Sequence, residues 1–109
     1  MLKASDKIST KSLLVAGCLF LAQAPAFAAD ANKGKVIAER WCASCHVVGA
    51  GQKSAPTDQA PPFASLAGKP DFGADRLAFL LLKPHPNMPQ LALSRSEVSD
   101  LADYIRTLK

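Results

Sequence analysis

The chain has 109 residues, with 13 basic and 9 acidic side chains and a formal net charge of +4. This length holds one domain at most, which excludes a multidomain enzyme. Much of the positive charge lies at the N-terminus, because residues 1–28 contain three lysines and one aspartate and the remainder carries only +2. The basic balance is therefore no evidence for a nucleic-acid partner.

The first 28 residues have the three parts of a secretory signal peptide. Three lysines give a positive start, residues 13–22 (LLVAGCLFLA) form an apolar run, and Ala26-Phe27-Ala28 is a small-residue cleavage site. The apolar run is too short to span a bilayer. We therefore expect cleavage after Ala28, export to the periplasm and a mature domain of residues 29–109.

Cys18 lies inside this leader and allows a second interpretation. Residues 15–18 (VAGC) resemble the lipobox of bacterial lipoproteins, in which the cysteine is acylated and tethers the protein to a membrane. The apolar run before Cys18 is short, and it continues past the cysteine. We therefore expect a leader cysteine that is removed, with a lipidated, membrane-tethered form as the alternative.

The mature part opens with residues 31–46, which are helical in character and end in the run CASCH. This C-x-x-C-H spacing is the attachment signature of a c-type haem. Positions i, i+3 and i+4 share one face of a helix, so Cys42, Cys45 and His46 can all point at one flat ligand. Each thiol can form a thioether with a haem vinyl group, and the imidazole can bind the iron.

Paired cysteines also occur in thioredoxin-like dithiols and in zinc sites. A thioredoxin-like protein needs alternating strands and helices, and this sequence has no convincing strand pattern. A zinc site needs four ligands, and the mature part holds only Cys42, Cys45, His46 and His85, of which two are adjacent. The haem interpretation is favoured, also because so short a domain builds only a modest apolar core that a haem would fill.

In the middle of the chain, a segment rich in glycine and proline is followed by short apolar segments. Residues 47–62 are rich in glycine and proline and predict a loop, while residues 63–68 (FASLAG) predict one helical turn. A longer helix is expected to start at Asp71 or Gly73 and to end before Pro84.

Two further segments follow. Residues 84–89 contain three prolines, which fix φ and remove backbone donors, so we expect an ordered, extended loop. The last helix should begin after Ser94, which forms a capping box with Glu97, and its apolar residues recur at helical spacing up to Leu108.

Met88 is the one methionine of the mature part, and it lies in the proline-rich loop. A lone methionine often only fills a core, but a rigid loop is suited to holding a sulfur in place. His85 is the competing candidate for a second axial ligand. A His/Met pair raises the reduction potential relative to two histidines and leaves no open iron position for oxygen or substrate.

From about Asp30 to Leu108 the chain resembles the small mono-haem class I c-type cytochromes. The motifs that carry this resemblance are Gly34 eight residues before Cys42, CASCH at 42–46, PPF at 61–63, NMP at 87–89 and LADYI at 101–105. The resemblance implies an all-α, cytochrome c-like fold of three to four helices wrapped around one covalently bound haem c. It also implies that Cys42 and Cys45 attach the haem and that His46 and Met88 ligate its iron.

Four other positions take roles by the same resemblance. Gly34 and Tyr104 match the positions at which the N- and C-terminal helices cross. Pro61 matches a proline whose carbonyl accepts a hydrogen bond from the axial histidine, and Phe63 matches an apolar haem contact.

The sequence departs from the family pattern in the first helix, where Ala38 replaces a usual aromatic residue and Trp41 is our candidate for the missing bulk. Ala60 replaces a common glycine, and Lys69 only loosely matches a basic residue near a haem propionate.

The resemblance implies a soluble, monomeric, periplasmic one-electron carrier that shuttles electrons between larger redox proteins and is not an enzyme. One alternative is a dedicated haem subunit, or a tethered cytochrome, of a dehydrogenase or oxidase complex. Another is a haem enzyme or gas binder, which would need an open iron position.

Overall fold

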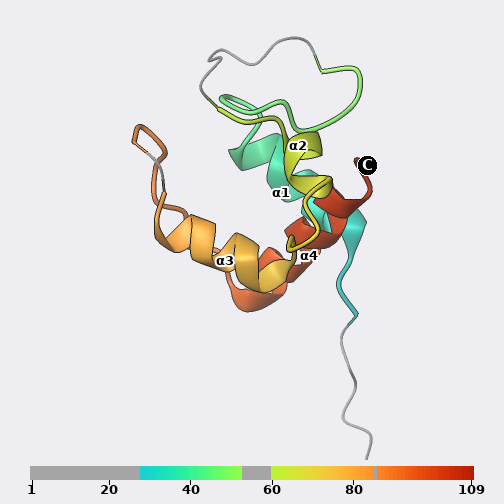
Figure 1. Cartoon of the computed structure of the whole chain (residues 1–109). Coiled ribbons are helices and arrows are strands. Elements are labelled where there is room, and N and C mark those ends of the chain that lie inside the picture. Colours follow the sequence, from blue (N-terminus) through green and yellow to red (C-terminus); the bar gives the residue numbers. More distant parts are fainter. Residues whose placement is uncertain (1–27, 53–59, 85) are drawn as a thin grey trace, which may run out of the picture.

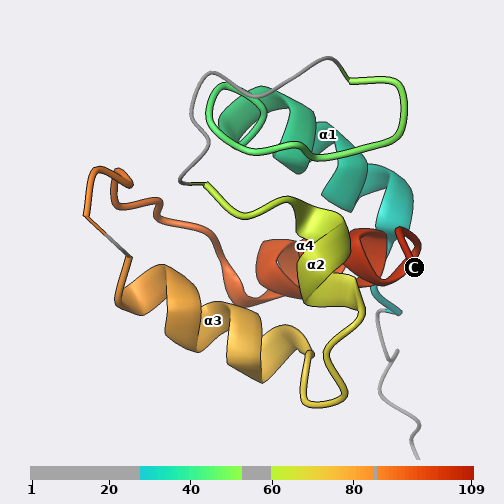
Figure 2. The same ribbon diagram turned by 45° about the horizontal axis from the view of Figure 1, so that its top comes forward.

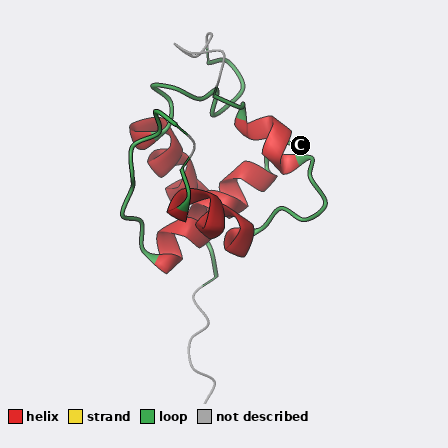
Figure 3. Cartoon of the chain, turned by 60° about the vertical axis from the view of Figure 1, so that its left-hand side comes forward, coloured by secondary structure: helices red, strands yellow, loops and turns green. Residues whose placement is uncertain are grey.

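A computed structural model describes residues 28–52, 60–84 and 86–109, and this part of the chain consists of helices and loops without strands (Figure 3). Its helices are, in order, α1 (Ala31–Trp41), α2 (Phe63–Ala67), α3 (Ala74–Leu82) and α4 (Arg95–Arg106) (Figure 1). The arrangement matches the expected all-α architecture. The expected leader, which includes Cys18, lies outside the described residues except for Ala28. His85 also lies outside them.

The first and last helices cross at close range (Figure 2). A Cβ atom on Gly34 would lie 2.0 Å from the carbonyl oxygen of Asp100 and 2.8 Å from the Cβ of Tyr104. Only glycine allows the two backbones to approach this closely. Next to the crossing, the backbone N–H of Asp30 donates to the Asp100 carboxylate at 2.7 Å, which ties the start of α1 to α4.

The expectation that Trp41 replaces a missing aromatic residue is wrong. Ala38 is completely buried, whereas 51% of Trp41 is exposed. Ala38 lies one turn after Gly34 on the same face of α1, so the tight crossing continues with a small side chain. Because the helices are already close, the packing there requires no large residue.

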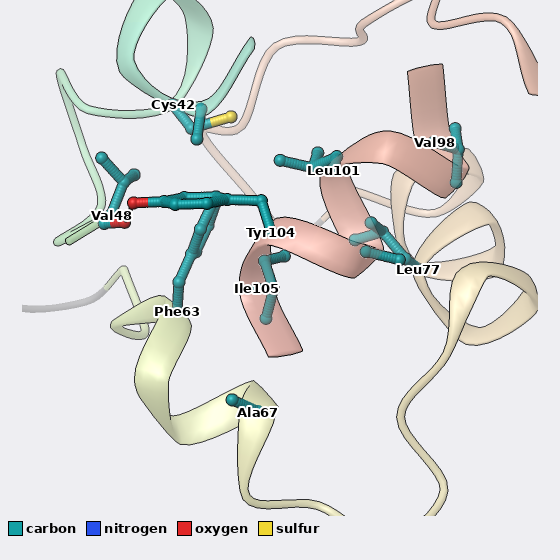
Figure 4. Packing of buried hydrophobic residues seen from close by; sticks show 11 residues of the cluster. Cys42, Val48, Phe63, Ala67, Leu77, Val98, Leu101, Tyr104 and Ile105 are labelled. Atoms are coloured by element: carbon teal, nitrogen blue, oxygen red, sulfur yellow. Dashed lines mark hydrogen bonds between the residues drawn. The ribbon is translucent and has the colours of Figure 1, made fainter. Parts of the chain in front are cut away.

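The apolar core is organised along one face of α4 (Figure 4). Leu101 and Ile105 are its largest fully buried side chains. The other helices and the loop after α1 contribute the rest of the cluster, including Cys42, Val48, Phe63, Ala67 and Leu77.

The start of α4 is the predicted capping box. The Ser94 hydroxyl accepts the backbone N–H of Glu97 at 3.2 Å, and the Glu97 carboxylate accepts the backbone N–H of Ser94 at 2.7 Å. Two backbone donors of the first turn are thereby satisfied.

The other boundaries refine the sequence prediction. Of the two possible starts for α3, the structure selects Gly73 as N-cap, and the helix ends at Leu82. Lys83 leaves the helical region with φ −120° and ψ 69°, because the ring of Pro84 disfavours a helical conformation in the residue before it.

None of the helices in the described ranges has the length and apolar character needed to span a membrane.

Candidate haem-binding site

The cysteine pair lies just beyond α1, which ends at Trp41 rather than continuing to residue 46. The chain leaves the helix through a wider turn, in which the backbone N–H of Ala43 donates to the carbonyl of Ala38. It then regains helix-like bonds, because Cys45 and His46 both donate to the carbonyl of Cys42, at 3.1 and 2.9 Å. These turns place both cysteines and the histidine on the wall of one cavity.

Cys42 and Cys45 do not form a disulfide. Cys42 is buried and Cys45 is half-buried. Burial raises the pKa of the Cys42 thiol to about 11, because desolvation disfavours the thiolate. Before a haem is attached, this thiol is therefore protonated at neutral pH, and its side chain packs among apolar neighbours.

The His46 imidazole is held in one orientation by the segment before α2. Its Nδ1 lies 2.7 Å from the carbonyl oxygen of Pro61. A carbonyl only accepts, so Nδ1 carries a proton and donates it, and in the neutral ring the lone pair then lies on Nε2. This is the tautomer in which an imidazole binds a metal.

Phe63 packs beside this imidazole. The two ring centroids are 5.4 Å apart, and Phe63 is buried at the start of α2. Its backbone N–H donates to the carbonyl of Val47 at 2.9 Å, which fixes the segment carrying Pro61 next to the loop after the cysteine pair.

Two cavities meet at this site. The first, of about 430 Å³, is bounded by residues 41–46, which we call the cysteine segment, and by the loop that carries Met88. The second, of about 290 Å³, lies between α2, α3 and α4 and is lined by apolar residues that include Phe63 and Leu77. Cys42, His46 and Met88 line both cavities, so the two spaces share a boundary at these three side chains.

The residues present fit a covalently attached haem. Both cavities are lined mainly by apolar side chains, and the first has both cysteines on its wall, which suits a large flat macrocycle with vinyl groups. Lys69, Arg76 and Lys83 line the second cavity, and their cationic groups suit two propionates.

Met88 is half-buried at this shared boundary, on the loop that follows α3. The preceding residue, Asn87, has φ 71°, a left-handed conformation that asparagine tolerates better than most residues. Pro89 follows directly and restricts the chain on the other side.

The competing zinc site is not assembled in the described residues. Within these ranges, no group of three or more Cys, His, Asp or Glu side chains is placed to hold a metal ion. The fourth candidate zinc ligand, His85, lies outside them.

Tyr104, from the LADYI motif, links α4 to the loop that follows the cysteine pair. Its hydroxyl donates to the carbonyl oxygen of Val48 at 2.6 Å (Figure 4). Burial raises the pKa of Tyr104, and the nearby Glu39 carboxylate raises it further, so the phenol stays protonated and remains a donor.

Gln52 also belongs to this site, and the sequence did not indicate it. Its side-chain amide forms hydrogen bonds with three backbone groups of residues 43, 46 and 48. A glutamine in a polar loop carries no motif, so only the folded loop brings this amide to the cysteine segment.

Comparison with known proteins agrees with this site. Residues 31–109 match the family model described as "Cytochrome c". Cytochrome c-552 from Bradyrhizobium diazoefficiens is 54% identical over 96 residues, which are 84% of this chain and 91% of that relative. Among solved structures, none matches the chain.

The family match spans all four described helices, the cysteine segment and the loop with Met88. The high identity to the relative also extends over most of both chains. The chain therefore belongs to the cytochrome c family as a small class I c-type cytochrome, an electron-transfer protein rather than an enzyme, with covalently bound haem c and its iron.

Proposed function

We propose that the protein is a soluble periplasmic one-electron carrier between larger redox proteins, with its haem attached through Cys42 and Cys45 and ligated by His46 and Met88. The observation that carries this proposal is the shared boundary of the two cavities. Met88 comes from a segment far from Cys42 and His46 in the sequence, yet all three residues line both spaces.

Haem iron supplies the one-electron chemistry when it is bound. The chain supplies the ligand set and the surroundings. His46 offers an imidazole in a fixed orientation, because Pro61 accepts its Nδ1 proton and leaves Nε2 as the nitrogen that would bind iron. Met88 offers a soft thioether, which favours ferrous iron and raises the reduction potential relative to a second histidine.

The proposed ligand set favours electron transfer over gas binding. If His46 and Met88 both bound the iron, no position would be left for oxygen, carbon monoxide or substrate. Buried apolar residues such as Phe63 and Leu77 line the second cavity and would shield a haem there from water, which would limit solvent reorganisation when an electron is transferred.

Replacing Met88 tests the ligation. In Met88→Ala, the absorption band that arises from thioether-to-iron charge transfer should disappear, the midpoint potential should fall, and the ferrous protein should bind carbon monoxide. Leu91→Ala is the matched control, because Leu91 lines the same cavity and has no ligand atom. A wild-type protein that lacks this band, and whose spectrum is unchanged in Met88→Ala but altered in His85→Ala, would show that His85, and not Met88, belongs to the ligand set.

The export part of the proposal rests on the leader at residues 1–28. Cleavage after Ala28 would leave Asp30 in place, and Asp30 caps α1 by accepting the backbone N–H of Asn32 at 2.9 Å. The intact mass of protein from a periplasmic fraction tests this. It should correspond to residues 29–109 plus one haem, whereas a chain that begins with acylated Cys18 would show the tethered alternative.

A further inference from the structure

We infer that Gln52 is a positioning residue for the axial histidine, and that its side-chain amide holds the backbone from which the His46 imidazole projects. This inference rests on the proposed ligation of the iron by His46. It concerns a residue outside the C-x-x-C-H motif, in the loop that follows it.

The Gln52 side-chain amide forms hydrogen bonds through both its nitrogen and its oxygen. Its Nε2 donates to the carbonyl oxygens of His46 at 2.9 Å and of Ala43 at 3.1 Å. Its Oε1 accepts the backbone N–H of Val48 at 2.8 Å. The opposite amide orientation would place Oε1 against two carbonyls that cannot donate, so the hydrogen-bonding partners fix the assignment of nitrogen and oxygen.

The end of α1 creates the need for these bonds. Because the helix ends at Trp41, no regular helical turn follows to offer N–H donors to the carbonyls of residues 43 and 46. Gln52 supplies two donors from a single side chain. It therefore replaces the missing turn at the point where the cysteine segment leaves the helix.

Side-chain hydrogen bonds also hold the backbone of Val48, two residues after His46. The N–H of Val48 is bound by Gln52, and its C=O is bound by the Tyr104 hydroxyl at 2.6 Å. The backbone of residues 46–48 is thus held by one side chain from its own loop and one from α4.

The consequence concerns the hydrogen bond at the other end of His46. Nδ1 donates to Pro61 at 2.7 Å, and this bond makes the imidazole a more basic iron ligand. If the backbone of His46 shifts, the bond to Pro61 weakens. A less basic imidazole stabilises ferric iron less, so the reduction potential should rise.

Two variants of the holoprotein test the inference. Gln52→Met keeps the length of the side chain and removes all three hydrogen bonds, while Gln52→Glu keeps the acceptor for Val48 and removes both donors. We expect Gln52→Met to raise the midpoint potential, and both variants to change the hyperfine-shifted NMR resonances of the His46 ring in the ferric protein. The carboxylate of Gln52→Glu itself lowers the potential, so this variant is judged by its resonances. If one variant does not accumulate as holoprotein, the other carries the test.

Ser94→Ala is the control for stability alone. It removes the cap at the start of α4, so it should lower the melting temperature and leave the potential and the His46 resonances unchanged. Gln52 variants that lower the melting temperature in the same way, with an unchanged potential and unchanged resonances, would overturn the inference. Absence of axial-imidazole resonances from the wild-type protein would instead overturn both the inference and the proposed ligation.

Discussion

Replacing Gly34 with alanine should destabilise the protein, because the new methyl group would enter the crossing of α1 and α4. Its Cβ would lie 2.0 Å from the carbonyl oxygen of Asp100 and 2.5 Å from the carbonyl carbon. These are backbone atoms of another helix, so they cannot move aside as the end of a flexible side chain could. The two helices would have to separate.

Two effects of opposite sign set the magnitude. Overpacking at a tight contact typically lowers the free energy of unfolding by 1–3 kcal/mol. We expect a loss of about 3 kcal/mol or more here, because the clash is with backbone atoms. Alanine regains about 1 kcal/mol through its higher helix propensity. The net loss should be about 2 kcal/mol or more, which corresponds to a fall in melting temperature of roughly 8 °C or more for a domain of this size.

Gly68→Ala is the matched control. Gly68 has φ −77°, which any residue adopts, and a Cβ there would meet no atom within 4 Å. This substitution should stabilise the protein by about 0.4–1 kcal/mol, through lower entropy of the unfolded chain. Thermal unfolding of both holoproteins, followed by circular dichroism at far-ultraviolet wavelengths, gives the comparison. A Gly34→Ala variant that melts with wild-type or with Gly68→Ala would refute the close crossing.

Two further predictions concern hydrogen bonds outside the helix crossing. Tyr104→Phe removes the donor to the Val48 carbonyl and should cost about 1–3 kcal/mol, because a polar group in the core loses its partner; an unchanged urea midpoint would contradict this. For Glu97, hydrogen bonds from the Ser94 backbone and then its side chain lower the pKa, so the ionised carboxylate stabilises the folded state. That contribution is present above the ordinary pKa of a glutamate and is lost as the pH falls through the lowered folded-state value. The stability gap between wild-type and Glu97→Ala should therefore narrow in acid, and thermal scans that show a constant gap from neutral to acidic pH would exclude this role.

Local rules were sufficient for much of the fold. The capping box at Ser94, the end of α3 before Pro84 and the short α2 all follow from neighbouring residues, and each is present in the structure. The helix crossing expected at Gly34 is present, and the nearby backbone of Asp100 explains why a glycine is required there. These features depend on interactions over a few residues, or on a glycine that a regular helix does not otherwise favour.

Two expectations about the first helix needed the tertiary structure. The periodic pattern extends to residue 46, but α1 ends at Trp41, since the turn at Ala43 widens before the cysteine segment. Trp41 was expected to pack at the helix crossing and is half exposed instead, because Gly34 and Ala38 already close that contact.

The sequence by itself determined the chemistry of the site, because the C-x-x-C-H spacing defines an attachment motif within five residues. It also offered Met88 as a candidate ligand and Pro61 as a partner for His46. Only the tertiary structure decided how these groups meet. The shared boundary of the two cavities and the bond from His46 to Pro61 join residues that are separated along the chain. Their distances depend on how α1, α4 and the loops pack, and no local pattern of residues encodes that packing.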